Sequence, residues 1–370
     1  ITPVWMQDAG KPLMISVEEQ NQVGMRVSDK GMVLFFNAKN GEELSRVNLP
    51  LPAGTQVTSL GEDQPGNPVV VLGLSNGQAL VFRHSYKVSY PDGKKTITPA
   101  IEYPYGETPI VLDPQGGALD HVNLSVNDST LVLAGSTGSK LNVLSLAREE
   151  NMMTDEVTNT ETRIDLPQMT AKVKALYIDP RQQWLYVIND RAQADVFRLR
   201  DKSLNGRYKL VDDATTEITA STQLVGGISL IFGDSKGGLS QWFMARDPDG
   251  EQRFKHIRSF QMGTSPIVEI TAEQRRKGFL ALDAAGEIGV FHSTAHRTLL
   301  VEKVAEGPGI MALSPRANRI IVEEGGKLLP LTLKNPHPEV SWSALWSKVW
   351  YENYDEPKYV WQIGRASCRE

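Results

Sequence analysis

The sequence predicts an all-β fold, a seven-bladed β-propeller with a short C-terminal helix. Three observations lead to this prediction. One hairpin pattern occurs seven times, small residues dominate its turn, and the repeats lie 40–62 residues apart. Most of these spacings are close to the roughly 40–50 residues of a propeller blade. Because a single blade cannot bury both faces of its sheet, consecutive blades must stack, and closing the ring removes the exposed ends.

Each repeat consists of an apolar run, a tight polar turn and a second apolar run that ends in a bulky residue. The stretches are GMRVSDKGMVLFF, VVVLGLSNGQALVF, LVLAGSTGSKLNVL, LYVINDRAQADVF, ISLIFGDSKGGLSQWF, FLALDAAGEIGVF and RIIVEEGGKLLPL. Their closing residues are Phe36, Phe82, Leu144, Phe197, Phe243, Phe291 and Leu331. The β-branched and aromatic residues beside each turn favour a β-hairpin. A shorter apolar strand precedes most hairpins and a more polar strand follows, which gives about four strands per unit.

A small residue stands five positions before each closing residue. These positions are Gly31, Gly77, Ser139, Ala192, Gly238, Gly286 and Gly326. A hairpin turn needs a positive φ, which glycine adopts without steric cost. We therefore expect Gly77, Gly238 and Gly286 to have positive φ or to lie in the turns.

The seven units predict a single propeller domain over residues 1–338. A pair of β-sandwiches is the alternative architecture, but sandwiches lack an even repeat of one hairpin. The motifs of WD40 and kelch repeats are absent. The longest spacing separates the second and third units and is rich in proline and glycine, which predicts an elongated outer hairpin and loop there.

Composition excludes several classes of protein. The 370 residues carry a net charge of −5, with a pI near 5.8, which argues against a nucleic-acid partner. The chain has no apolar run of 18 residues and no secretion signal at its start. Its single cysteine, Cys368, lies in Ile363–Glu370, which we interpret as a non-native tail. Without that tail no disulfide can form, which fits a cytoplasmic or an exported protein.

Candidate chemistry is sparse. His292 and His296 have the spacing of a helical metal-binding pair, but they follow a strand and lack a metalloprotease glutamate. Gly135–Lys140 only partly matches a phosphate-binding loop, and Asp247–Glu251 is too short for a calcium loop. We interpret all three as loops or turns. The sequence therefore predicts no catalytic residue, no metal site and no cofactor.

The segment 339–362 differs from the repeats because it is rich in tryptophan. Trp342, Trp346 and Trp350 recur every four residues, which predicts one face of a short amphipathic helix, and Trp361 follows. Such a stripe either packs on the propeller or lies at a membrane–water interface. We predict that these four tryptophans form an exit segment that contacts a membrane or a partner.

Three stretches resemble a known family. NPHPEVSWSALWSKVWYENYDEPKYVWQ resembles the region before the second transmembrane helix of long, proteobacterial PstC-type permeases of the phosphate ABC transporter. GDSKGGLSQWFM and RRKGFLALDAAGEIGVFHSTAHRTLL are similar to the large insert that these permeases carry after their first transmembrane helix. The resemblance covers Ile1 to Gln362. It ends at Ile363, where such permeases continue into a polar linker and the membrane-spanning core.

The resemblance implies a non-catalytic periplasmic domain attached to the inner membrane through flanking helices. Its expected partners are the other subunits of a phosphate ABC transporter, namely the partner permease, the ATPase and the periplasmic phosphate-binding protein. The residues that carry out transport lie outside this chain. The alternative function is a free-standing propeller scaffold or sensor that binds a protein or peptide. A quinoprotein-type enzyme is disfavoured because metal and cofactor signatures are absent.

Overall fold

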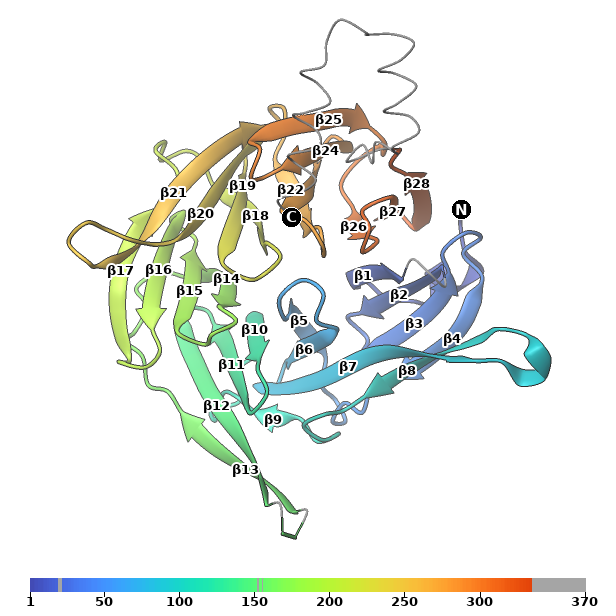
Figure 1. The fold of residues 1–370 in the computed structure, drawn as a ribbon, viewed down its shortest axis with the longest axis horizontal. Coiled ribbons are helices and arrows are strands. Elements are labelled where there is room, and N and C mark those ends of the chain that lie inside the picture. Colours follow the sequence, from blue (N-terminus) through green and yellow to red (C-terminus); the bar gives the residue numbers. More distant parts are fainter. Residues whose placement is uncertain (19–21, 152, 155, 335–370) are drawn as a thin grey trace, which may run out of the picture. The chain divides into compact units, whose positions relative to one another are not determined.

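Seven antiparallel sheets surround a central axis and form the blades of a β-propeller (Figure 1). The computed structural model describes residues 1–18, 22–151, 153–154 and 156–334, and the ring occupies Ile1–Thr332. The predicted seven-bladed propeller is thus confirmed. The predicted C-terminal helix and Trp342, Trp346, Trp350 and Trp361 lie outside the described residues.

The strands of each blade follow one another in sequence order from the axis outward. Blade 1 contains β1 (Pro12–Glu18), β2 (Val23–Ser28), β3 (Met32–Asn37) and β4 (Glu43–Asn48). Blade 2 contains β5 (Val57–Glu62), β6 (Val69–Leu74), β7 (Gln78–Ser89) and β8 (Thr96–Glu102), with β9 (Ile110–Val111) paired to β7. Blade 3 contains β10 (His121–Val126), β11 (Thr130–Thr137), β12 (Lys140–Asn151) and β13 (Glu156–Arg163).

The remaining four blades follow the same order. Blade 4 contains β14 (Val173–Ile178), β15 (Trp184–Asn189), β16 (Gln193–Arg198) and β17 (Ser203–Lys209). Blade 5 contains β18 (Ile218–Gln223), β19 (Ser229–Asp234), β20 (Gly238–Arg246) and β21 (Gln252–Gln261). Blade 6 contains β22 (Ile267–Ala272), β23 (Gly278–Asp283), β24 (Glu287–His292) and β25 (Arg297–Lys303). Blade 7 contains β26 (Ile310–Leu313), β27 (Arg319–Glu324) and β28 (Lys327–Thr332). Two short 3₁₀ helices, η1 (Val4–Gln7) and η2 (Pro91–Gly93), lie outside the sheets.

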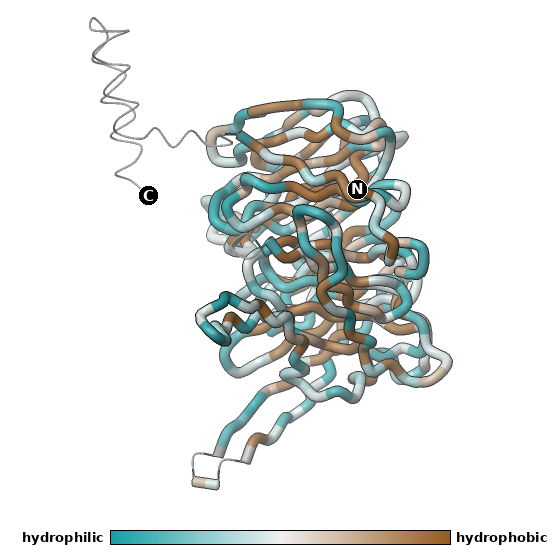
Figure 2. Tube along the Cα trace, turned by 90° about the vertical axis from the view of Figure 1, so that its right-hand side faces the viewer, coloured by the Kyte–Doolittle hydropathy of each residue, from teal (hydrophilic) through white to brown (hydrophobic). Residues whose placement is uncertain are grey.

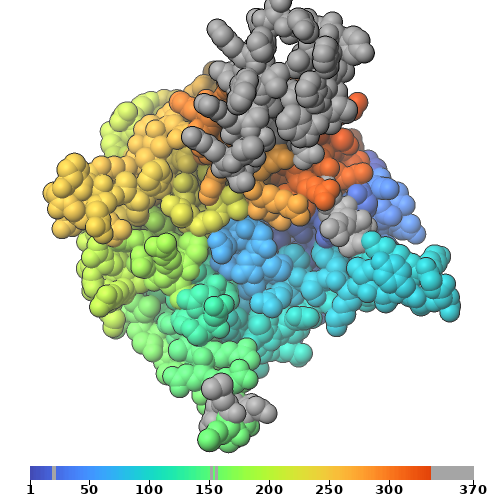
Figure 3. All heavy atoms as spheres, in the orientation of Figure 1, coloured from blue at the N-terminus to red at the C-terminus, as the bar shows by residue number. Residues whose placement is uncertain are grey.

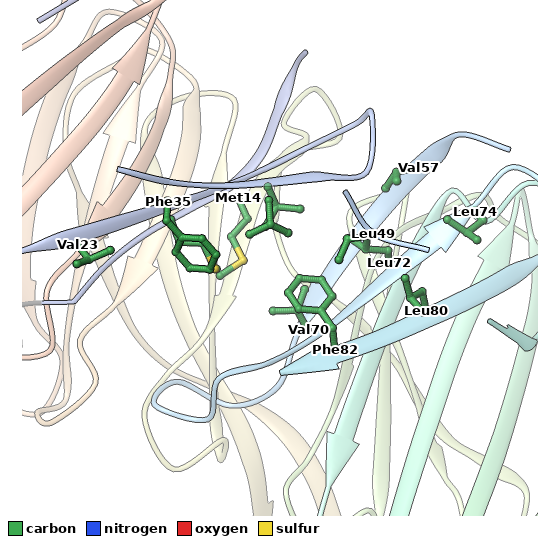
Figure 4. Packing of buried hydrophobic residues seen from close by; sticks show 13 residues of the cluster. Met14, Val23, Phe35, Leu49, Val57, Val70, Leu72, Leu74, Leu80 and Phe82 are labelled. Atoms are coloured by element: carbon green, nitrogen blue, oxygen red, sulfur yellow. The ribbon is translucent and has the colours of Figure 1, made fainter. Parts of the chain in front are cut away.

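The hydrophobic core lies between blades rather than inside any one of them. Met14 and Phe35 of blade 1 belong to the same buried cluster as Leu72 and Phe82 of blade 2 (Figure 4). Figure 2 shows the matching distribution, with hydrophobic segments along the strands inside the ring and hydrophilic ones at many of the loops. The middle strands are therefore apolar on both faces, which explains their continuous hydrophobic runs.

The predicted turn glycines are confirmed in blades 2 and 6. Gly77 and Gly286 have φ of 80° and 84°, and each lies in the turn between the second and third strands of its blade. The prediction for Gly238 is wrong by one position. Gly237 takes the positive φ, 79°, while Gly238 begins β20. The reason is that Trp242, not Phe243, pairs opposite Leu230, so the repeat in blade 5 is shifted by one residue.

Blades 1 and 7 close the ring through a buried ion pair. The Arg26 guanidinium donates to both carboxylate oxygens of Glu323 at 2.8–3.0 Å, and to the carbonyls of Ala9 and Gly10 at 2.9 and 2.7 Å. The side chains of Arg26 and Glu323 are only 2% and 5% exposed. The backbone of Ile1 also exchanges two hydrogen bonds with Leu328 of β28. The first and last parts of the ring are thereby joined.

Three outer hairpins are longer than the others and reach beyond the ring (Figure 1). The pair β7 and β8 lies between the second and third repeats, which confirms the predicted elongated hairpin. The pairs β12–β13 and β20–β21 are elongated in the same way but were not predicted. They lie in the intervals from Leu144 to Phe197 and from Phe243 to Phe291, whose lengths of 53 and 48 residues exceed the shorter spacings by only a few residues.

Candidate functional site

The seven inner strands surround a central channel with a volume of about 470 Å³. All of β1, β5, β10, β14, β18, β22 and β26 contribute to its lining. The loop between β5 and β6 also lines it, and on the face turned to the viewer this loop lies over the centre of the ring (Figure 3). The channel is therefore the main internal space in which the ring could receive a ligand.

Most polar side chains on the inner strands are used to join neighbouring blades. The Tyr177 hydroxyl lies 2.7 Å from the Ser221 hydroxyl, which links blades 4 and 5. Asn123 in blade 3 donates to the Glu62 carbonyl of blade 2 and accepts from the Ile178 amide of blade 4. Because these groups already have partners, their burial is explained by the architecture.

The buried aspartates have a structural role as well. Asp283 accepts hydrogen bonds from the amides of Ala285 and Glu287 in its hairpin turn, at 3.0 and 2.9 Å. Asp179 accepts from the amides of Gln183 and Trp184 at 2.7 and 2.6 Å. Aspartate stabilises turns by accepting such bonds, so these carboxylates need no catalytic explanation.

Two carboxylates in the channel are different. The side chains of Glu62, at the end of β5, and Glu269, in β22, make no hydrogen bond or ion pair with any described residue. Burial, together with the smaller effect of the negative charge of Glu62, raises the pKa of Glu269 to about 8. Burial also raises the pKa of Glu62, even though its side chain reaches the solvent inside the channel. These raised pKa values favour the neutral carboxyl groups, and a cationic group bound in the channel would favour their charged form.

Both histidines of the His292 and His296 pair have hydrogen-bond partners of their own. The ring Nδ1 of His292 accepts from the Ala295 amide at 3.1 Å, while Nε2 of His296 bonds to the Ser259 carbonyl at 2.7 Å. Within the described ranges, no group of three or more His, Cys, Asp or Glu side chains is placed to hold a metal ion. His292 is the last residue of β24 and His296 lies in the turn that follows, so the loop interpretation is confirmed for His296 and is wrong for His292.

The other two weak motifs are also turns. Asp249 pairs with Arg253, and Asp247 pairs with both Arg253 and Lys255, so this acidic stretch fastens the β20–β21 hairpin. Gly138, in the turn between β11 and β12, has a φ of 62° and is followed by a strand. A phosphate-binding loop needs a helix at that point.

The structure also shows one histidine–serine contact that the sequence did not suggest. Nε2 of His256 lies 2.8 Å from the Ser259 hydroxyl on the outer strand β21. Both groups lie in an exposed contact, and no hydrogen bond is found between a carboxylate and the His256 ring in the described part of the chain. An activated serine normally needs a base that a third group orients. No such third group orients the His256 ring in the described part of the chain. A histidine and a serine three residues apart on a strand match no known sequence motif, so the sequence analysis did not identify the contact.

The predicted exit-segment tryptophans cannot be placed at any site, since they lie outside the described residues. Among the residues that the structure describes, no helix is both long and apolar enough to span a bilayer. The membrane interface at Trp342, Trp346, Trp350 and Trp361 stays a prediction.

Comparison with known proteins supports the fold. No family model and no curated protein matches the chain. The structure is similar to the β-propeller domain of Cps50 (Swd1) from Myceliophteria thermophila, with a TM-score of 0.57 at 10% identity, covering 88% of this chain and 97% of that one. It is also similar to Raptor from Chaetomium thermophilum, with a TM-score of 0.58 at 15% identity, covering 88% of this chain but 28% of that one. A chain of the Mitotic Checkpoint Complex matches with a TM-score of 0.54 at 12% identity, covering 87% and 89%. At these identities the likeness shows the propeller fold.

Proposed function

We propose that this propeller is a non-catalytic scaffold that binds a protein partner. The polar groups of the inner strands and turns are largely committed to structure, while apolar side chains are exposed on the outer surface. The similar propellers include the β-propeller domain of Swd1 and a chain of the Mitotic Checkpoint Complex, whose name states that it is an assembly. These likenesses support a scaffold as the class of function.

The outer strand of blade 6 is the observation that carries this proposal. Every residue of β25 is exposed, and three consecutive apolar residues, Leu299, Leu300 and Val301, are 42%, 38% and 38% exposed. In β4, the outer strand of blade 1, exposed and half-buried residues alternate instead. Consecutive apolar residues on an exposed outer strand are avoided in proteins without partners, because they promote association. Addition of a partner strand would cover them.

The test uses cells that carry the complete gene. A photo-reactive amino acid at Leu300 should crosslink to one protein, which mass spectrometry then identifies. The double variant Leu299→Glu/Val301→Glu should prevent formation of that complex, because it places two charges where apolar contact is needed. Leu44→Glu is the matched control, since Leu44 is a 48% exposed apolar residue on β4.

The control variant should retain the complex and all variants should keep the circular dichroism of the wild type. Crosslinking that is equally efficient from positions 44 and 300 would show random collision. Absence of any crosslinked protein at Leu300 would reject this surface.

We further propose that the partner machinery is a phosphate importer of the inner membrane and that the ring faces the periplasm. The sequence resemblance to PstC-type permeases supports this finer assignment. Under it, the crosslinked protein is another transporter subunit, such as the periplasmic phosphate-binding protein. Identification of an unrelated protein would leave the scaffold function in place and reject the importer.

Uptake measurements test the importer directly. Replacement of Ile1–Thr332 by a short flexible linker should alter phosphate uptake, its regulation or the assembly of the permease. The matched control carries Leu44→Glu in the intact gene. Normal uptake, regulation and assembly after removal of the ring would contradict a role in transport.

A further inference from the structure

A second cleft, with a volume of about 350 Å³, lies where blades 2 and 3 meet. Arg83 on β7 and Arg148 on β12 contribute two guanidinium groups to its lining. Asn67, in the loop between β5 and β6, lines both this cleft and the central channel. The cleft is therefore adjacent to the channel but differs from it in the sign of its charged groups.

The two arginines act on the same aromatic side chain. Burial raises the pKa of the Tyr105 hydroxyl, and the positive charges of Arg83 and Arg148 oppose that rise. Both guanidinium groups therefore lie within electrostatic range of one point in the cleft. They come from different blades, so the meeting of the blades brings them together.

Neither guanidinium has a partner in the part of the chain that the structure describes. Arg83 and Arg148 form no ion pair or side-chain hydrogen bond there, although Glu102 stands opposite Arg83 in the β7–β8 ladder. Asp128 is the one acidic residue in the lining. The lining thus has a net charge of +1, while the whole chain has −5.

Guanidinium groups with free donors bind oxyanions, because their planar forks match carboxylate and phosphate oxygens. The volume of the cleft lies in the range of about 300–1,000 Å³ that holds organic ligands, which is more room than a single inorganic anion uses. Tyr105 and Pro104 add an apolar wall, which suits a peptide segment better than a free ion.

We propose that the cleft between blades 2 and 3 binds the carboxylate side chains of an acidic segment of a partner protein through Arg83 and Arg148. This inference rests on the proposed scaffold function and names the chemistry of one contact. It assigns the acidic segment to this cleft and the apolar contact to β25.

The experiment measures binding to the purified ring by calorimetry. One probe is an acetylated and amidated peptide of alternating glutamate and glycine, with the glutamine peptide as its neutral counterpart. The other probe is inorganic phosphate. The test variant is Arg83→Gln/Arg148→Gln. The control variant is Arg200→Gln/Arg246→Gln, which removes two exposed cations that lie neither in the cleft nor on β25.

We expect the glutamate peptide to bind and the glutamine peptide not to bind. The test variant should weaken binding about tenfold or more, because it removes the charge-assisted hydrogen bonds of both guanidinium groups. The control variant should bind within about twofold of the wild type, and added salt should weaken binding. Arg83→Lys/Arg148→Lys should rescue only part of the affinity, since it keeps the charge but loses the fork.

Three results would overturn the proposal. They are binding of phosphate without binding of the peptide, equal losses in the test and control variants, and no binding of the glutamate peptide at millimolar concentration. Because this test does not involve β25, its failure together with a crosslink at Leu300 would reject the cleft and leave the scaffold function standing.

Discussion

The ion pair between Arg26 and Glu323 should be the most sensitive polar contact at the junction of blades 1 and 7. Replacing Glu323 by Gln leaves the guanidinium of Arg26 in place, 2% exposed and without its counter-charge. Removal of one partner of a buried pair typically costs about 3–5 kcal/mol, because the remaining charge stays out of water. We expect a loss of this size in the free energy of unfolding.

The double variant Arg26→Met/Glu323→Leu should lose much less than the sum of the single variants. It removes both charges and keeps apolar volume, an exchange that is often neutral or stabilising. The carbonyls of Ala9 and Gly10 would still lose their donor, at about 1 kcal/mol each. We therefore expect a net loss of about 2–3 kcal/mol for the double variant.

Urea denaturation at pH 7, followed by far-ultraviolet circular dichroism, provides the measurement. Arg46→Met is the control, because it breaks the exposed Arg46–Glu43 pair, whose side chains are 43% and 32% exposed, and should change stability little. The loss in Glu323→Gln should persist at high salt, since a buried pair is weakly screened. Either of two results would refute this account of ring closure. One is a loss below about 1 kcal/mol in Glu323→Gln. The other is a loss of stability in the double variant that equals the sum of the losses in the single variants.

Three further predictions follow from single residues. Gly286→Ala should destabilise the ring by about 2–4 kcal/mol in the same urea assay, because its φ is 84° and a Cβ would lie 2.1 Å from the Ala305 carbonyl oxygen. Gly250→Ala is the control. Gly250 has a φ of 86° but open space around a Cβ, so this variant should lose about 1–2 kcal/mol. The pKa of Glu269 is raised from 4.5 to about 8, so the folded state binds more protons in that window and stability should fall as pH rises through it. In Glu269→Gln the plot of stability against pH should be flatter in this window, by on the order of 1–2 kcal/mol. The change is this small because solvent in the channel screens the charge. An unchanged plot would contradict the raised pKa. Burial lowers the pKa of His84 from 6.5 to about 4, so the free energy of unfolding should fall as pH falls through that range. His84→Gln should lose less stability than the wild type over the same range. Equal losses in both proteins would show that His84 is not responsible.

The blade repeat could be predicted because its physical requirements recur in every unit. Each unit needs apolar middle strands and a turn that tolerates positive φ, and both requirements leave marks at fixed spacing. The register differs in blade 5, where Trp242 and Phe243 are adjacent and either could be the closing aromatic residue, and in blade 3 the positive φ is at Gly138 and not at Ser139. A choice between neighbouring aromatics depends on which side chain the next blade buries, and spacing alone does not contain that information.

The channel and the cleft could not be predicted, because each is made by residues distant in sequence. Glu62 and Glu269 belong to blades 2 and 6, and no local pattern links them. Arg83 and Arg148 meet only because blade 2 packs against blade 3. The weak motifs that the sequence did offer, such as His292 and His296, are local and lie at the end of a strand and in its turn. The channel and the cleft, by contrast, arise only where blades meet.

Ring closure also bears on how such a domain could be attached within a larger protein. Ile1 bonds to Leu328, and Thr332, the last residue of the ring, lies four residues further along β28. Both ends of the ring are therefore held by blade 7, within a few residues of each other. A domain whose ends lie close together can be inserted into a loop at a small cost in chain entropy. The closure would also fix the position of β25 and of the cleft between blades 2 and 3 relative to that attachment. A ring attached in this way could present both surfaces to partners, and a domain inserted into a loop, as we propose, would need such closely spaced ends.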